Sequence, residues 1–97
     1  MEYVTLNNGV KMPMLGYGVF QTPLEETERC VKEALEVGYR LIDTAQAYGN
    51  EEGVGAAVAK SGIPREEIFI TSKIWVSNMN YERARVSIDE TLKKLGT

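Results

Sequence analysis

Histidine is absent from the sequence, and cysteine occurs once, at Cys30. Without histidine, the chain cannot supply a Ser-His-Asp triad or a zinc site of the Cys/His type, so we expect no metal site. A single cysteine forms no internal disulfide and is typical of a reducing compartment, so we expect a cytoplasmic protein. The sequence also lacks an apolar run of about 18 residues and a basic leader followed by an apolar stretch. We therefore expect neither a transmembrane helix nor a secretory signal.

An excess of positive charge is lacking too, because 11 lysines and arginines face 14 acidic residues and the net charge is −3. Nucleic-acid-binding domains carry clustered lysine and arginine, so the composition excludes that class of function. The 97 residues form one domain at most. A chain of this size buries roughly 60–65% of its unfolded surface, which is enough for a modest core.

The order of elements predicts an α/β fold. Residues 3–12 read as a β-hairpin, because Asn8-Gly9 suits the positive φ of a primed turn. Three strand–helix units follow at about 15–37, 39–61 and 68–95. Strands that alternate with helices pair in parallel through right-handed crossovers. This pattern fits a small open sheet or the first three-eighths of a (β/α)8 barrel, and the pattern alone does not distinguish the two.

Residues at the helix ends define the predicted boundaries. Thr22 is expected to cap the first helix with Glu25 in a capping box, and Asn50 and Asn80 are expected to cap the next two. The third helix carries an apolar stripe that we expect to face the core: Tyr81, Ala84, Ile88, Leu92 and Leu95.

Three residues suited to proton transfer fall at the carboxyl ends of the strands, where parallel α/β folds place their sites. Asp43 ends the second strand, Lys73 ends the third, and Tyr48 lies on the loop after Asp43. An ammonium group close to a phenol stabilises the phenolate, and a carboxylate holds the ammonium in place. Together they form a general acid that can protonate an oxyanion near neutral pH.

Each of these residues also has a structural explanation when it is considered alone. Asp43 can begin a turn by accepting from the Thr44 or Ala45 amide. Lys73 can be a solvated charge or half of a structural ion pair, and Tyr48 can be a surface ring. Only the coincidence of all three at one rim makes the catalytic interpretation as strong as the structural one.

Other motifs are weaker. Gly16-x-Gly18-x-x-Gln21 lacks the third glycine of a dinucleotide fingerprint, as does Gly53-x-Gly55-x-x-Val58, and no phosphate-binding loop motif is present. Trp75 suits either an apolar pocket or a packing role. Cys30 lies near the buried stripe of the first helix, where an inert core role is expected.

Three segments resemble the aldo-keto reductases, in chain order and over essentially the whole length. Residues 38–51 read GYRLIDTAQAYGNE and resemble the first signature of that family. Residues 6–13 with 15–20, LNNGVKMP and LGYGVF, resemble its capping hairpin and first strand, and residues 70–75, ITSKIW, resemble the strand with its active-site lysine. The most similar members are of the prokaryotic type, such as 2,5-diketo-gluconate and methylglyoxal reductases.

The resemblance implies a (β/α)8 barrel that reduces aldehydes and ketones with NADPH as cofactor and a small carbonyl compound as substrate. By position, Tyr48 donates the proton, Lys73 assists it and Asp43 holds Lys73. The residues implied near the nicotinamide are Gly18, Val19, Phe20 and Asp43. The residues implied around the substrate are Phe20, Tyr48 and Trp75. No metal, nucleic acid or membrane takes part.

The sequence departs from the family in two ways. Members use a histidine on the next strand to orient the carbonyl, and this chain has none. A barrel needs about 250 residues, so these 97 match the first three units. We therefore expect the isolated chain to be inactive and to self-associate through exposed strand edges. Two alternatives remain open: a non-catalytic interaction subunit, and an inert folding or assembly fragment of such a barrel.

Overall fold

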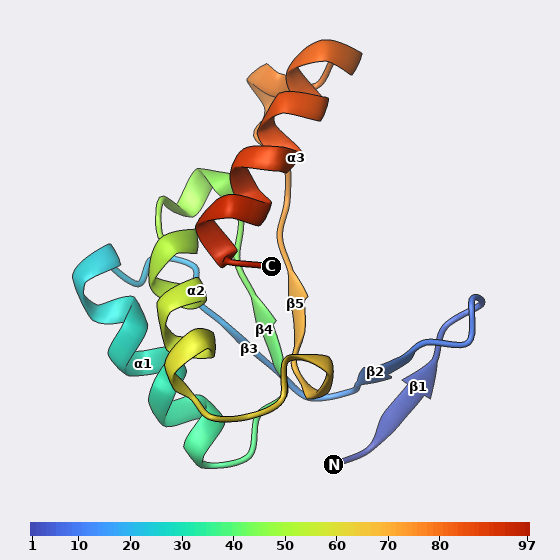
Figure 1. Ribbon diagram of the computed structural model, residues 1–97, viewed down its shortest axis with the longest axis vertical. Helices are drawn as coiled ribbons and strands as arrows, with labels where there is room; N and C mark the ends of the chain where they lie inside the picture. Colours follow the sequence, from blue (N-terminus) through green and yellow to red (C-terminus); the bar gives the residue numbers. More distant parts are fainter.

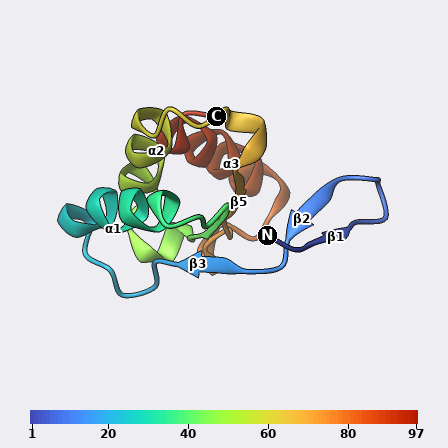
Figure 2. The ribbon, with the colours of Figure 1, turned by 90° about the horizontal axis from the view of Figure 1, so that it is seen from below.

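A β-hairpin and three strand–helix units make up the computed structural model, which describes residues 1–97 (Figure 1). The hairpin pairs β1 (Tyr3–Thr5) with β2 (Lys11–Pro13) in antiparallel fashion. It extends away from the helices in both ribbon views (Figures 1 and 2).

The hairpin turn differs from the primed turn that the sequence suggested. Gly9 has φ +86°, whereas Asn8 is not among the residues with positive φ. The Gly9 N–H donates to the Leu6 carbonyl at 2.9 Å, and Asn8 Oδ1 accepts from the Val10 N–H at 3.1 Å. This side-chain bond fits the negative φ of Asn8, so only Gly9 adopts the left-handed conformation. An Asn-Gly turn of type I′ needs positive φ at both central residues, so the predicted primed turn at Asn8-Gly9 is wrong.

Three short parallel strands form the main sheet in the order β3-β4-β5. They are β3 (Gly16–Gly18), β4 (Leu41–Asp43) and β5 (Phe69–Thr71). The helices α1 (Leu24–Glu36), α2 (Glu51–Lys60) and α3 (Tyr81–Leu95) gather on one side of it (Figure 2). Short 3-10 turns lie between: η1 (Gln46–Tyr48), η2 (Arg65–Glu67) and η3 (Val76–Asn78). The predicted class is confirmed, since this is the arrangement that opens a (β/α)8 barrel.

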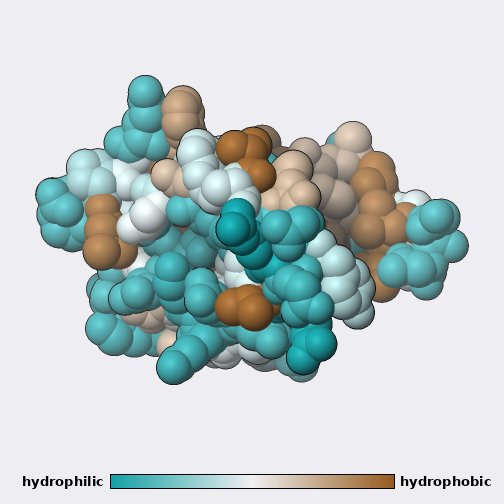
Figure 3. Space-filling view, turned by 90° about the horizontal axis from the view of Figure 1, so that it is seen from above, coloured by the Kyte–Doolittle hydropathy of each residue, from teal (hydrophilic) through white to brown (hydrophobic).

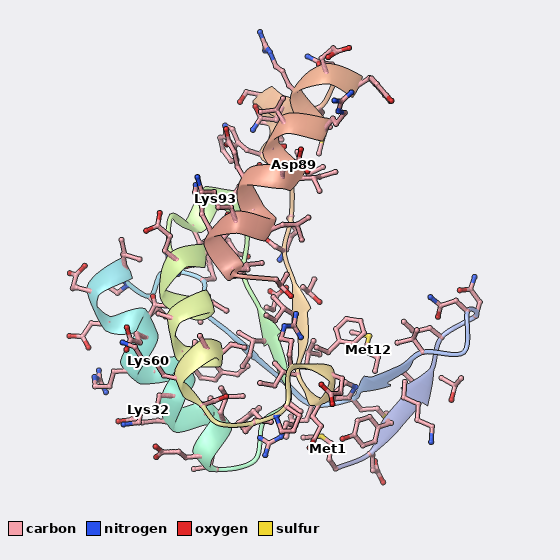
Figure 4. The ribbon with its side chains drawn as sticks, in the orientation of Figure 1. Met1, Met12, Lys32, Lys60, Asp89 and Lys93 are labelled. Carbon is pink, nitrogen blue, oxygen red and sulfur yellow. The ribbon has the colours of Figure 1, made fainter.

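The core lies between the sheet and the helices. Ile42 is fully buried, and the cluster around it comprises Val19, Val31, Leu35, Val54, Ala57, Val58, Ile68 and Leu95. Successive side chains of a strand point to opposite faces, so Leu41 and Asp43 point to the other face of the sheet, away from the helices. Charged side chains such as Lys32 and Lys60 project on the helical side, where Lys60 pairs with Glu28 at 2.8 Å (Figure 4).

The first helix begins later than predicted. Pro23 occupies the N-cap position of α1, and no side chain caps the helix. The Thr22 N–H donates to the Val19 carbonyl at 3.0 Å, so Thr22 belongs to the preceding turn rather than to a capping box. The prediction for Asn80 is confirmed, because its side chain accepts from the Arg83 N–H at 2.9 Å.

The apolar stripe of α3 is largely exposed, against expectation. Tyr81, Ile88 and Leu92 are 79%, 47% and 42% exposed, while Leu95 is 5% exposed. The C-terminal end of α3 packs against α2, and the rest of the helix runs beyond the sheet (Figure 1). The regular apolar spacing marks a face of α3 that is suited to burial, but no other part of residues 1–97 covers most of that face.

Candidate active site

The parallel register aligns the carboxyl ends of the three strands. Gly18 lies beside Asp43, and Asp43 lies beside Thr71. Lys73 follows Thr71 by two residues, so its side chain leaves the same face of the sheet as that of Asp43. Lys73 Nζ donates to Asp43 Oδ1 and to the Thr44 carbonyl, each at 2.8 Å.

Two oxygens therefore hold the ammonium at a fixed place on the rim. The two side chains of the ion pair are 49% and 40% exposed, so both reach solvent. The Thr44 N–H donates to the Thr71 carbonyl at 2.8 Å, which continues the sheet and leaves that amide unavailable to an Asp43 turn. The carboxylate of Asp43 instead accepts from Lys73.

Tyr48 reaches the same place from η1. This turn follows Ala45 and ends at Gly49, whose φ of +68° lets the chain reverse before α2. Lys73 Nζ lies 5.3 Å from the centroid of the Tyr48 ring, within the range of a cation–π contact. The structure thus brings Asp43, Lys73 and Tyr48 together.

Phe20 and Trp75 differ in how they lie relative to Asp43, Lys73 and Tyr48. The rings of Phe20 and Tyr48 lie 5.2 Å apart at 49°, and Phe20 is 66% exposed. Trp75 is 48% exposed and forms no ring pair with either of them. Phe20 and Tyr48 therefore form one aromatic wall, and Trp75 stands apart on the segment after Lys73.

The backbone beside Asp43 is open to a ligand. A Cβ built on Gly18 would meet nothing within 4 Å. Val19 is fully buried and donates its N–H to the Asp43 carbonyl at 3.1 Å, so its side chain faces the core rather than this space. No group of three metal-ligating side chains occurs, and no helix has the length and apolarity to cross a membrane.

Asn50 has a role that the sequence did not reveal. It was predicted to cap α2, but its side chain makes no cap bond. It is fully buried, and its Nδ2 donates to the carbonyls of Val19 and Thr22, each at 3.0 Å. Its Oδ1 accepts from Thr44 Oγ1 at 2.8 Å. Asn50 therefore ties the loop that carries Phe20 to the end of β4.

Glu51 makes the corresponding connection on the other side. It is 3% exposed and accepts from Ser72 Oγ at 2.6 Å and from Thr91 Oγ1 at 3.3 Å. Ser72 directly precedes Lys73, so this carboxylate helps to hold the end of β5. The sequence marks Glu51 only as a first-turn acid, because its partners are distant along the chain.

Comparison with known proteins gives consistent matches. The sequence matches the profile of the Aldo/keto reductase family over residues 12–97. It is 50% identical over 93 residues to an aldo-keto reductase of Mycolicibacterium smegmatis, which covers 96% of this chain and 34% of that protein. An aldo/keto reductase from Brucella melitensis superposes with a TM-score of 0.95 at 53% identity, over 99% of this chain and 37% of that one.

A structure with a bound nucleotide is also similar. The Bombyx mori aldo-keto reductase in complex with NADP superposes with a TM-score of 0.91 at 34% identity, over 98% of this chain and 34% of that one. The chain thus spans about a third of the length of the relatives that it matches.

Proposed function

Because the chain belongs to the Aldo/keto reductase family, as its motifs indicated, we propose that it carries the proton-donating part of a site for NADPH-dependent reduction of aldehydes and ketones. The observation that carries this proposal is the position of Lys73. Its ammonium is held by Asp43 and the Thr44 carbonyl and lies 5.3 Å from the Tyr48 ring centroid.

In this mechanism Tyr48 donates a proton to the carbonyl oxygen. A reduced nicotinamide, when bound, supplies the hydride that goes to the carbonyl carbon. The oxygen gains the phenolic proton, so the product is an alcohol and Tyr48 is left as a phenolate. The Lys73 ammonium stabilises this phenolate, and Asp43 keeps the ammonium in place.

The residues around Gly18 fit a planar cofactor ring. The space in front of Gly18 is open, and Asp43 lies beside Gly18 on the neighbouring strand. Phe20 follows Gly18 by two residues and packs against Tyr48. Within this proposal Gly18, Val19, Phe20 and Asp43 lie at the nicotinamide end, and Val19 contributes only its backbone because its side chain is buried. The NADP complex of the Bombyx mori relative supports a nicotinamide cofactor.

Three aromatic side chains would border the carbonyl substrate: Phe20, Tyr48 and Trp75. All three lie on loops at the carboxyl ends of the strands, where α/β barrels bind their substrates. Their rings offer apolar surface around one polar group, the Tyr48 hydroxyl, which suits a small aldehyde or ketone.

We test the proposal by grafting residues 1–97 onto the Brucella melitensis reductase in place of its matching part, after first measuring the activity of that parent. We expect the chimera to oxidise NADPH with an α-keto aldehyde, followed by absorbance of the reduced nicotinamide. The 97-residue chain alone should leave NADPH unconsumed. The side chains of Lys73 and Asp43 are 49% and 40% exposed, so water and salt screen the charge that they present to Tyr48. Steady turnover by the chain alone would contradict this expectation.

Replacing Tyr48→Phe in the chimera removes the proton donor and keeps the ring. General acid catalysis contributes roughly 10²–10⁴-fold, so we expect kcat to fall by at least about 100-fold. Tyr81→Phe makes the same chemical change at a 79% exposed position on α3 and should leave kcat unchanged. A chimera that binds NADPH but shows no Tyr48-dependent reduction would support the non-catalytic interaction subunit instead.

A further inference from the structure

Gln46, the first residue of η1, joins three segments through one side-chain amide. Its Oε1 accepts from the Trp75 N–H at 2.7 Å and from Asn78 Nδ2 at 3.4 Å. Its Nε2 donates to the Ser87 carbonyl and to Thr91 Oγ1, each at 3.0 Å. An amide side chain has two donor hydrogens and two acceptor lone pairs, so these four bonds use its full capacity.

The acceptor side of this amide extends the sheet beyond its last paired residues. The Thr44 N–H donates to the Thr71 carbonyl at 2.8 Å, and the Gln46 N–H donates to the Lys73 carbonyl at 3.0 Å. The next bond in this ladder comes from the Trp75 N–H, and the Gln46 side chain accepts it in place of a backbone carbonyl. Gln46 therefore holds both ends of segment 73–75.

The donor side fixes the same amide to α3. The Ser87 carbonyl belongs to the helix backbone, and Thr91 also bonds to the buried Glu51. Gln46 is thus anchored on the helix while it holds the strand segment. Two residues later on the same turn lies Tyr48, whose ring contacts Lys73.

We propose that Gln46 is a positioning residue that sets the place of Trp75 relative to Tyr48, and so the width of the carbonyl pocket. The pocket part of this inference rests on the proposed function, whereas the bond between Gln46 and segment 73–75 does not. A glutamine is required because the site needs one acceptor facing Trp75 and one donor facing α3. Methionine has a similar length and supplies neither of them.

The first test measures the position of Trp75 in the 97-residue chain, because Trp75 is its only tryptophan. We expect Gln46→Met to raise the acrylamide quenching constant of Trp75 about twofold and to shift its emission to the red, with the far-UV spectrum retained. The matched control is Gln21→Met, the same chemical change at an exposed position, which should change neither. Unchanged quenching in Gln46→Met would overturn the proposal.

A milder variant keeps this test decisive if Gln46→Met loses its helical signal. Thr91→Val removes one of the four amide bonds and the 3.3 Å bond from Thr91 to Glu51, whereas the Ser87 bond of Gln46 and the Ser72 bond of Glu51 stay in place. We expect a smaller rise in Trp75 quenching in the same direction. Quenching equal to that of the unmodified chain would again overturn the proposal.

The second test uses the chimera with phenylglyoxal as the carbonyl compound. We expect Gln46→Met to raise KM about tenfold and to change kcat less than threefold, because the donor Tyr48 remains while the pocket wall moves. In a Trp75→Ala background, the same substitution should no longer change KM. A loss of kcat at constant KM, or an equal KM effect without the tryptophan, would overturn the pocket role. If the chimera with Gln46 intact reduces nothing, the proposed function fails and the fluorescence result still decides the positioning role.

Discussion

The ion pair between Lys73 and Asp43 lies half in solvent, with side chains 49% and 40% exposed. Exposed pairs of this kind contribute roughly 0.2–1 kcal/mol to stability. The second acceptor, the Thr44 carbonyl, restricts where the ammonium can lie more than it adds to the free energy of folding. The geometry is therefore better explained by the placement of a charge near Tyr48 than by stabilisation of the fold.

Lys73→Met separates these two effects. We expect the free energy of unfolding to change by less than about 1 kcal/mol, since the pair is exposed. In the chimera, kcat should fall at least about 100-fold, because in the proposed mechanism the phenolate of Tyr48 loses its stabilising charge. Lys60→Met, which breaks the exposed pair with Glu28, is the matched control and should leave kcat unchanged. Equal kcat values for the two variants would contradict the role of Lys73.

Gln21 is the one non-glycine residue with positive φ, at +64°, in the turn closed by the Thr22 N–H and the Val19 carbonyl. This conformation costs a residue with a Cβ about 1–2 kcal/mol, and the extra chain entropy that glycine loses offsets part of the difference. We expect Gln21→Gly to raise the free energy of unfolding by about 0.5–1 kcal/mol in urea titrations. Gln21→Ala keeps the Cβ and should give no gain. A gain in both variants would show that the glutamine side chain, not its backbone, is unfavourable.

The sequence predicted that Asp43, Tyr48 and Lys73 lie close together, because strand ends and a family motif mark them along the chain. The hydrogen bonds of the Asn50 and Gln46 side chains could not be predicted in this way. Asn50 reaches Val19, 31 residues earlier, and Gln46 reaches Thr91, 45 residues later. Side-chain bonds between distant segments depend on how the helices dock on the sheet, and no local pattern records that docking.

At the level of elements, α2 is the helix that joins the other two. It packs between α1 and α3, and a Cβ built on Gly53 would lie 2.8 Å from the Cβ of Thr27 on α1. A Cβ on Gly55 would meet the Lys94 carbonyl and lie 2.8 Å from the Cα of Leu95 on α3. Glycine at these positions lets the backbones approach closely, and this explains why α3 is held at its C-terminal end.

Gly55→Ala tests this contact. Helix propensity alone would favour alanine by about 1 kcal/mol, so any loss must come from the collision with α3. We expect the free energy of unfolding to fall by about 1–3 kcal/mol and the amides of residues 92–95 to exchange faster. Gly18→Ala, where a Cβ meets nothing within 4 Å, is the control and should cost little. A neutral Gly55→Ala would show that α3 docks elsewhere.

Element order was predictable because strand and helix periods differ and because the turns carry glycine and proline. The exposure of α3 was not predictable, since its apolar stripe records only the face suited to burial. The absence of a side-chain cap on α1 was not predictable either. Thr22 is a good capping residue by type, but its N–H is bonded within the turn that precedes the helix.

At the scale of the molecule, the surface is large for the mass. The accessible area is 6390 Å², compared with roughly 5,500 Å² for a compact monomer of 10.8 kDa. The radius of gyration is 13.5 Å, compared with about 12.5 Å for a compact chain of 97 residues. Apolar side chains, in brown, interrupt the hydrophilic surface in Figure 3. The large apolar residues that are exposed include Trp75, Val86 and Ile88.

The face of the sheet away from the helices accounts for part of this area. Ile70 packs against the core, so Phe69 and Thr71 point to the opposite face. β3 and β5 pair with β4 alone, and each leaves one edge of backbone groups without a strand partner. Such edges and faces favour pairing with another chain. The excess area, about 900 Å², is close to the roughly 800 Å² per partner that a specific interface buries.

We therefore expect the 97-residue chain to self-associate, with a sedimentation coefficient that rises with concentration. Thr71→Lys places a charge on the half-buried face of the sheet away from the helices, at the edge strand, and a charge there opposes strand pairing. This variant should shift the association to higher concentration. Val37→Lys adds the same charge at a 77% exposed position after α1 and should not shift it, so net charge cannot explain a difference between the two. If the chain remains monomeric at every concentration, or if both substitutions have equal effects, the edge of β5 and the sheet face away from the helices do not drive association.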